Sequence, residues 1–497
     1  MESRLERFRE IIKEKKLLDS TLAILHWDIE TEAPKGGQEL LSQMIGNISL
    51  KAYEISTSEE LNEIVEFLKN MKNELNEIDK KEIENYSEEM EKLSKIPPME
   101  YKAYTELTAK AQGVWEKAKN ENNFSIFKEY LEKIFNYNIK FGKYRNPNKN
   151  PYDVILDDYE KGMDRKKLDE FFKDLRENIV PLLKSIQEKK IDNSKYIDGE
   201  VSKCSQVLIS RFLGEYLGFD FNRGIISESE HPFTLTVNMD DVRITTKYIK
   251  ELPVSAIFST IHECGHGIYE QGIDEKLKYT LLADGASMGI HESQSRFYEN
   301  ILGRSKSFWE PIYEKLQEKY TYLKDITLDE FYLGINDVKA SLIRVEADEL
   351  TYSLHIMVRY EIEKGIFEGK YKIGDLPEIW NEKMREYLGV VPENDREGVL
   401  QDVHWACGLI GYFPSYALGN VYSLQIYNKM KKDLNIEKIL KEGKLHLIKE
   451  WLGEHIHKYG KLKNPEEILK EITGEGLNSK YYIEYLKEKY SKIYNLK

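Results

Sequence analysis

The sequence predicts an almost entirely α-helical fold with one small antiparallel β-sheet, or hairpin. Apolar residues recur every three to four positions along most of the chain, which indicates half-buried helices. Only 30 glycines and 13 prolines occur in 497 residues, so turns are few and the helices must be long. β-Branched residues alternate in only one convincing segment. An apolar content of 41% supplies a large core and excludes global disorder.

Helical periodicity dominates from residue 3 to about residue 145. Apolar residues from Leu5 to Ile12 follow the spacing of a helix that buries one face. Thr57 and Glu60 have the spacing of a capping box, which predicts that a helix begins there. A segment rich in Asn and Pro, 146–151, then predicts a loop.

The strand signal lies in residues 226–246, with Asn238–Asp241 as the turn of a hairpin. Helical periodicity resumes at Pro253 and continues to the end of the chain. No linker-like stretch interrupts the sequence, so we expect one unit with two lobes around a cleft. The first lobe, 1–225, is mainly helical; the second, 226–497, holds the hairpin, the catalytic motifs and the C-terminal helices.

Charge and cysteine content exclude several classes of protein. The net charge of −14 and the absence of a long basic run argue against nucleic-acid binding. Neither a signal-peptide pattern nor 18 consecutive apolar residues occurs, so we expect no membrane segment. The three cysteines, Cys204, Cys264 and Cys407, have no paired spacing, which favours a reducing compartment. These features predict a cytoplasmic protein.

The strongest functional motif is His262-Glu-Cys-Gly-His266, in an apolar helical stretch that Pro253 opens. Residues four apart share one helix face, so both imidazoles can bind one metal ion. Glu263 is then placed beside the metal, as a general base that takes a proton from water. The motif predicts a hydrolytic metal site.

A catalytic zinc site needs a third protein ligand and an open fourth position. The positions three and six residues after His266 hold Tyr269 and Gly272, which excludes the metzincin pattern. Glu292 lies in a helical stretch farther along the chain, where Ser295, Arg296 and Glu299 could orient it. Spacing alone leaves three other candidates open: Glu270, Asp274 and Glu275.

Five segments together resemble the thermostable carboxypeptidases of the Taq type, zinc metallocarboxypeptidases related to the gluzincins. The segments are His231–Phe233, Asp241–Thr245, His262–His266, His291–Gln294 and Gly398–Trp405. Similar stretches at 25–34, 344–352 and 472–477 extend the resemblance over essentially the whole chain. The resemblance implies Glu292 as the third zinc ligand, a helical body with a long substrate groove, a small sheet beside the active site, and a homodimer. Histidine and carboxylate ligands would also accept Co²⁺ or Mn²⁺.

Other residues are candidates for binding the substrate and its oxyanion. His404, with Tyr416 or Tyr412, resembles a His and Tyr pair that faces the metal in related helical zinc peptidases. A carboxypeptidase must also bind a free carboxylate, for which arginine is suited. Arg344 is our first candidate and Arg359, expected in the same helical run, is the second.

These features predict a zinc carboxypeptidase that removes single residues from peptides with a free C-terminus. An oligopeptidase that cuts inside short peptides is the nearest alternative, because related helical zinc peptidases share the ligand set. A non-catalytic peptide-binding scaffold is the alternative from another class. The presence of Glu263 argues against it, because a scaffold has no need of a general base.

Overall fold

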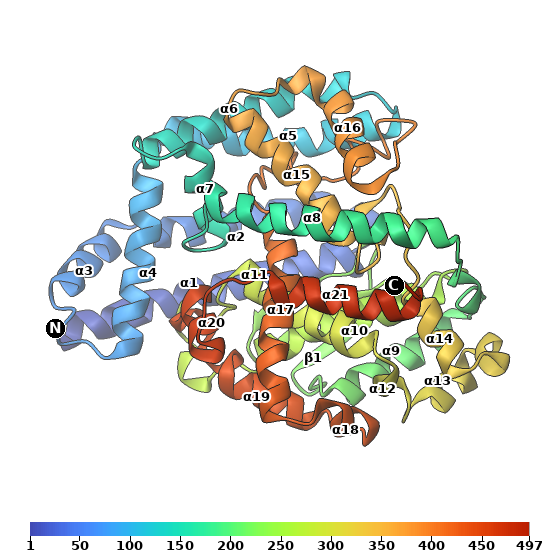
Figure 1. Cartoon of the computed structure of the whole chain (residues 1–497). Helices are drawn as coiled ribbons and strands as arrows, with labels where there is room; N and C mark the ends of the chain where they lie inside the picture. Colours follow the sequence, from blue (N-terminus) through green and yellow to red (C-terminus); the bar gives the residue numbers. More distant parts are fainter. Residues whose placement is uncertain (497) are drawn as a thin grey trace.

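Helices make up most of the chain in the computed structural model, which describes residues 1–496, and three short strands form one sheet (Figure 1). The predicted fold class is confirmed. The chain begins with four helices: α1 (Glu2–Thr31), α2 (Gln38–Ser56), α3 (Glu59–Asn70) and α4 (Glu77–Ser94).

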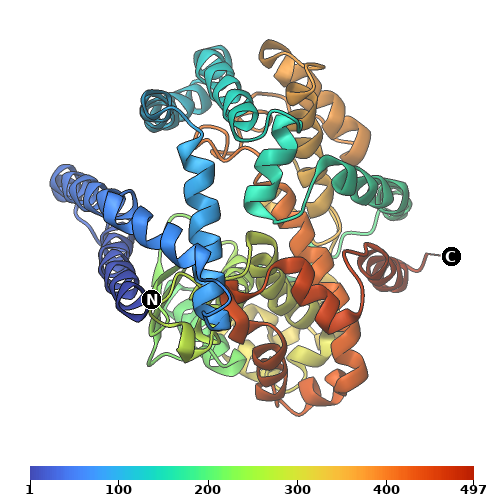
Figure 2. The same ribbon diagram turned by 90° about the vertical axis from the view of Figure 1, so that its left-hand side faces the viewer.

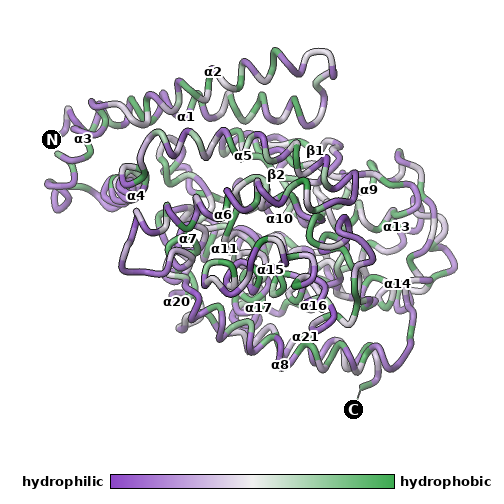
Figure 3. The backbone as a smooth tube through the Cα atoms, turned by 90° about the horizontal axis from the view of Figure 1, so that it is seen from above, coloured by the Kyte–Doolittle hydropathy of each residue, from purple (hydrophilic) through white to green (hydrophobic). Residues whose placement is uncertain are grey.

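The helices α1 and α2 form an antiparallel hairpin that stands out along one edge of the molecule (Figures 2 and 3). The apolar stripe of α1, which includes Phe8 and Ile12, is buried against α3 and α4. The predicted capping box at Thr57 is wrong. Thr57 ends α2, and Ser58 has the extended backbone of an N-cap and accepts the N–H of Leu61.

Five helices follow before the sheet: α5 (Pro98–Asn120), α6 (Ser125–Arg145), α7 (Pro151–Tyr159), α8 (Arg165–Lys189) and α9 (Lys203–Leu217). From the second half of the chain, α15 (Tyr352–Phe367) and α16 (Leu376–Leu388) return to pack on α6 and α8, in the upper part of Figure 1. Residues far apart in sequence therefore share this layer. The division into two lobes at residue 225 stays a prediction.

The sheet has the strand order β1 (Gly224–Glu228), β3 (Asp241–Thr246), β2 (Thr234–Asn238). The strands β2 and β3 form the predicted antiparallel hairpin. The expectation of a purely antiparallel sheet is wrong, because β1 pairs in parallel with the other edge of β3. The chain crosses over between β1 and β2, and a connection of this kind gives no hairpin signal. Val242 and Ile244 of β3 are fully buried, and β3 packs on the helix that follows.

The helices α10 (Pro253–Gln271) and α11 (Met288–Arg296) lie at the centre of the molecule, and a π-helical segment, Phe297–Gly303, continues α11. Two glycines permit close packing around them. A Cβ atom on Gly265 would lie 2.6 Å from the Cα of Ser295, and one on Gly419 would lie 2.5 Å from the Cγ of Glu292. Glycine at these positions therefore lets three helix backbones approach.

The remaining helices cover this centre: α12 (Lys306–Trp309), α13 (Tyr313–Lys319), α14 (Leu328–Ile335), α17 (Pro414–Asp433), α18 (Ile436–Lys441), α19 (His446–His455), α20 (Pro465–Thr473) and α21 (Lys480–Ile493). The longest of them, α17, crosses α11 directly. Within residues 1–496, no helix has both the length and the apolar character needed to cross a bilayer.

Candidate active site

His262 and His266, from one face of α10, converge with Glu292 of α11. One ligand atom from each of the three residues lies within 4.8 Å of the other two. The Oε2 atom of Glu292 is 3.7 Å from Nε2 of His262 and 3.5 Å from Nε2 of His266. The imidazoles are 18% and 16% exposed, so solvent and substrate can reach this cluster.

The three residues fit a divalent metal ion with nitrogen and oxygen ligands. Zn–N and Zn–O bonds of about 2.1 Å in a tetrahedral site place ligand atoms about 3.4 Å apart, close to the separations from Glu292 to the two imidazoles. The burial of Glu292 also requires cations nearby. Although its burial opposes ionisation, Arg296 and the histidines hold the pKa of Glu292 far below its usual range, so the ligand is a carboxylate.

A group of charged side chains orients His262 and Glu292. The Nδ1–H of His262 donates to Oε2 of Glu299 at 2.8 Å, which leaves Nε2 free to bind a metal. Arg296 donates to Oε1 of Glu292 at 2.7 Å and to Glu299 at 3.1 Å. Burial raises the pKa of Glu299, but Arg296 and the hydrogen bond from His262 lower it further, to about 2. Glu299 lies in the π-helical segment, a feature frequent at functional sites.

His291 plays the same part for His266. The Nδ1 atoms of the two rings are 2.6 Å apart, and Nε2–H of His291 donates to Oε1 of Glu270 at 2.8 Å. Burial lowers the pKa of His291 but Glu270 raises it above its usual value. For Nε2 of His266 to bind a metal, Nδ1–H of His266 must donate to a His291 ring that has given up its own Nδ1 proton. Glu270, an alternative third ligand, is therefore turned toward His291. The other two alternatives are engaged elsewhere: Asp274 caps a short helix, and Glu275 pairs with Lys278.

Glu263 is buried beside His262 in α10, and a residue of the sheet fixes its side chain. Its Oε2 atom accepts the hydroxyl of Thr234, in β2, at 2.6 Å. Burial raises the pKa of Glu263 above its usual value. A carboxylate of raised basicity is suited to accept a proton from water. The small sheet therefore contributes directly to this site.

His404 and the two tyrosines come together around the start of α17. The Nε2 atom of His404 is 3.1 Å from the hydroxyl of Tyr416, and the rings of His404 and Tyr412 are 5.7 Å apart. Burial lowers the pKa of His404 to about 4, so the ring is neutral at pH 7. Tyr412 also contacts Met288, the first residue of α11, which links this group to the metal helix.

Arg344 and Arg359 both bind one carboxylate, that of Asp402. Arg344 donates to Oδ1 at 3.0 Å and also to the hydroxyl of Tyr352, and its guanidinium lies 5.0 Å from the ring centre of Tyr416. The structure thereby places Arg344 in the group around His404. Contrary to the sequence expectation, Arg344 lies in a 3₁₀ turn (Arg344–Glu346) and not in the helix of Arg359.

Arg359 does not fit a direct contact with substrate. Its side chain is fully buried in α15, and its nitrogens donate to Asp402, to Gln401 and to the carbonyl of His355. Every arm of the guanidinium is engaged, as is also true of Arg344, but the Arg359 side chain is fully buried, whereas that of Arg344 is 8% exposed and lies beside Tyr416. The position of Arg359 behind Asp402 indicates that it holds that carboxylate for Arg344.

Sequence reasoning missed several supporting residues. It linked Glu299 to Glu292, whereas the carboxylate contacts His262 and Arg296. It gave no role to Thr234 or to Asp402 as the shared partner of the two arginines. Only their positions near recognised motifs could have suggested them, because their contacts join distant parts of the chain.

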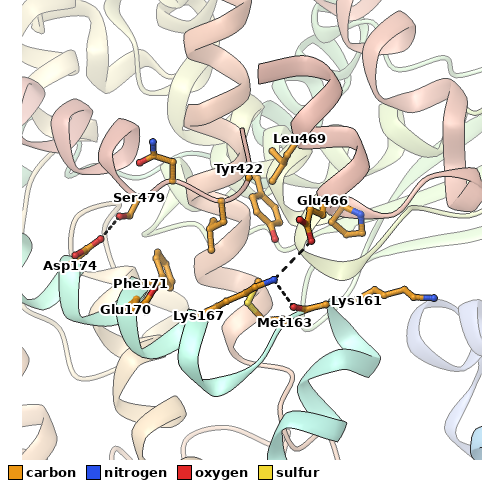
Figure 4. Close-up of a pocket in the computed structure, with 15 residues that line it drawn as sticks. Lys161, Met163, Lys167, Glu170, Phe171, Asp174, Tyr422, Glu466, Leu469 and Ser479 are labelled. Carbon is orange, nitrogen blue, oxygen red and sulfur yellow. Dashed lines mark hydrogen bonds and ion pairs between the residues drawn. The ribbon is translucent and has the colours of Figure 1, made fainter. Parts of the chain in front are cut away.

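A separate cavity of about 300 Å³ lies between α8, α17 and α20 (Figure 4). Its lining includes Phe171, Leu469 and Tyr422, and Lys167 faces Glu466 across it. None of the predicted site residues lines this cavity, and the long substrate groove stays a prediction.

Comparisons with known proteins agree with this geometry. The model of the carboxypeptidase Taq (M32) metallopeptidase family matches residues 7–490. Carboxypeptidase 1 of Bacillus subtilis is 47% identical over 99% of both chains, and thermostable carboxypeptidase 1 of Pyrococcus furiosus is 37% identical over 94% of both. The solved M32 carboxypeptidase of Deinococcus radiodurans superposes with a TM-score of 0.96 at 29% identity, covering 99% of this chain and 100% of the other. This chain therefore belongs to the carboxypeptidase Taq (M32) family of metallopeptidases.

Proposed function

We propose that this metallocarboxypeptidase holds Zn²⁺ with His262, His266 and Glu292 and shortens peptides from a free C-terminus. The observation that carries the proposal is the convergence of three ligand atoms whose imidazole and carboxylate groups are already oriented by Glu299, His291 and Arg296. When bound, the ion supplies Lewis-acid polarisation of the scissile carbonyl and makes water more acidic. Co²⁺ and Mn²⁺ suit the same donors.

Glu263 is proposed as the general base. Thr234 fixes its carboxylate, and its raised pKa favours proton transfer from the attacking water. The same carboxyl group can then give the proton to the departing amine. Water loses the proton, the peptide nitrogen gains it, and Glu263 returns to its starting state.

His404 and Tyr416 are proposed to stabilise the oxyanion, with Tyr412 beside them. Both groups stay uncharged near neutral pH, because burial lowers the pKa of His404 and raises that of Tyr416 well above its usual value. A neutral imidazole and a phenol have one donor hydrogen each, and the hydrogen bond between His404 and Tyr416 uses one of them, so the pair offers the other to an oxygen that gains charge. This role needs donors held in place before the reaction.

Arg344 is proposed to bind the C-terminal carboxylate of the peptide. It is the member of the arginine pair whose guanidinium adjoins the aromatic group of the site, at Tyr352 and Tyr416. Asp402 fixes the guanidinium, so little conformational freedom is lost when a carboxylate binds. A carboxypeptidase requires such a residue, whereas an endopeptidase does not.

Mass spectrometry of products from a peptide ladder tests this proposal and its nearest alternative. With Zn²⁺ or Co²⁺, we expect successive loss of single C-terminal residues from free-acid peptides. A C-terminally amidated copy of each peptide is the control and should remain intact. Cleavage of the amidated copy at internal bonds would support the oligopeptidase and overturn the proposed role of Arg344.

We also propose a homodimer in the cytoplasm. The family resemblance supports the dimer, and three free thiols support a reducing compartment. Sedimentation analysis of the metal-loaded protein tests the dimer, with a mass near twice the 58.5 kDa of one chain as the expected result.

A further inference from the structure

We propose that Glu363 is a positioning residue that fixes the loop Trp405–Gly411 and thereby sets the placement of His404 and Tyr412. The inference rests on the proposed function, because it concerns the side chains assigned there to the oxyanion. Glu363 lies in α15, is fully buried and belongs to none of the motifs in the sequence.

The carboxylate of Glu363 binds both ends of the loop. Its Oε1 atom accepts the indole N–H of Trp405 at 2.7 Å, and its Oε2 atom accepts the backbone N–H of Gly411 at 2.9 Å. A third donor, the hydroxyl of Tyr152 in α7, reaches Oε2 at 2.7 Å. The residues immediately outside the two anchored ends are His404 and Tyr412, whose rings lie 5.7 Å apart.

The loop has little regular structure of its own. It belongs to no helix longer than a turn, and Gly408 and Gly411 adopt positive φ angles of 76° and 85°. Short backbone contacts, such as Leu409 N–H to the carbonyl of His404, close individual turns but do not connect the loop to the body. Two sets of contacts connect it: the hydroxyl of Tyr104, in α5, donates to the carbonyl of Gly408 at 3.3 Å, and Glu363 binds both ends of the loop.

The donors around the anchor favour an ionised carboxylate, against the burial that raises the pKa of Glu363 to about 7. Three neutral donors approach the two oxygens, and no Lys, Arg or His pairs with Glu363 among the described residues. A buried carboxylate without a cation is costly, so a glutamine of the same shape would be favoured if only packing mattered. Glutamine has one acceptor oxygen, however, and would turn its NH₂ group toward at least one of the donors. The three contacts therefore explain the choice of glutamate.

Thiol labelling of Cys407 measures the order of this loop without reference to catalysis. Cys407 is half-buried within the loop, Cys264 is fully buried and Cys204 is exposed, so Cys204→Ser gives a background with one accessible thiol. In this background we compare Glu363→Gln with Tyr152→Phe. The latter removes a hydrogen bond from the same carboxylate but leaves both loop contacts in place.

We expect Glu363→Gln to speed the labelling of Cys407 by about tenfold or more and to lower kcat about 10- to 100-fold, the range for partial loss of oxyanion stabilisation. The metal content should stay stoichiometric, and KM should change less than kcat because the loop acts on the transition state. Tyr152→Phe should resemble the background in labelling and kcat. Trp405→Phe, which deletes the indole donor, provides the same comparison if Glu363→Gln does not fold.

Equal labelling rates in Glu363→Gln and Tyr152→Phe would overturn the anchoring role. Faster labelling with an unchanged kcat would overturn the positioning role. His404→Ala, measured in parallel, separates that failure from a failure of the proposed function: if its kcat is also unchanged, the assignment of His404 to the oxyanion is wrong as well.

Discussion

The two halves of the active site are built in different ways. The proposed metal ligands lie in regular helices, and α10 and α11 touch each other directly at Gly265 and Ser295. His404 adjoins an irregular loop that Glu363 of α15 binds at both ends. Regular helix geometry therefore positions His262, His266 and Glu292, whereas long-range hydrogen bonds position His404. Substitutions in the two halves should therefore fail in distinct ways.

The largest effect is expected from Glu263→Gln, which tests chemistry in the helical half. Glutamine fills nearly the same space and still accepts the hydroxyl of Thr234, but it cannot take a proton from water. We expect turnover to fall by about a hundredfold or more, while metal content and peptide binding stay near normal. Steady-state kinetics and metal analysis measure both quantities.

Glu275→Gln is the matched control for that experiment, because Glu275 is 73% exposed and its one ion pair within residues 1–496 is with Lys278 of the same short turn. It should change neither quantity. Full turnover in Glu263→Gln with stoichiometric metal would show that another group is the base. Absence of turnover in the metal-loaded wild type would instead support the non-catalytic scaffold.

Glu292→Gln should remove metal and activity together, because one of the three protein ligands is weakened. Glu299→Gln should be milder, since it removes a partner of His262 and not a ligand; loss of such a partner typically weakens metal affinity about 10- to 100-fold. Titration with Zn²⁺ against a competing chelator measures both affinities. Normal metal content and turnover in Glu292→Gln would place the third ligand elsewhere, with Glu270 next in line.

Arg344→Lys tests the irregular half, with Arg359→Lys as its counterpart. Lysine keeps the charge but loses the planar fork, so Arg344→Lys should lower kcat/KM for free-acid peptides about tenfold or more, largely through KM. Arg359→Lys should instead lower Tm, because it breaks buried contacts with Asp402 and Gln401. A larger KM effect in Arg359→Lys would reverse the roles that burial assigns to the two residues.

The contrast also explains how far the sequence could predict the molecule. The His262 to His266 spacing and the hairpin at Asn238 depend on local geometry, so both were readable from residue order. The parallel pairing of β1 and the 3₁₀ turn at Arg344 depend on contacts with distant segments, and both were misjudged. Glu363 has no local signal at all, because its three partners come from residues 152, 405 and 411.

The smallest effect on metal affinity and turnover is expected at Glu82. This residue binds the segment that connects α10 to α11. Its Oε1 atom accepts the N–H of Leu281 at 2.7 Å, from a buried site on α4. Burial raises the pKa of Glu82 to about 7. This resembles the anchor at Glu363, yet α10 and α11 also contact each other directly. We therefore expect Glu82→Gln to leave metal affinity and kcat unchanged, since glutamine can still accept the N–H of Leu281.

Stability should nevertheless change with pH, and the sign follows from the raised pKa of Glu82. The folded protein keeps the proton up to a pH of about 7, whereas an unfolded glutamate loses it near its ordinary value of 4.5. The stabilisation is therefore present below about pH 4.5 and is lost as the pH rises to about 7. Glutamine does not titrate, so Glu82→Gln should gain stability relative to wild type between pH 5 and pH 8, by on the order of 1–3 kcal/mol. Thermal unfolding of both proteins at the two pH values measures this difference. Subtracting the wild-type values removes the contributions of Glu160 and Glu363, whose pKa values burial also raises to about 7.

A loss of metal affinity in Glu82→Gln would mean that α10 and α11 depend on their connection as His404 depends on Glu363, and the contrast between the two halves would not hold.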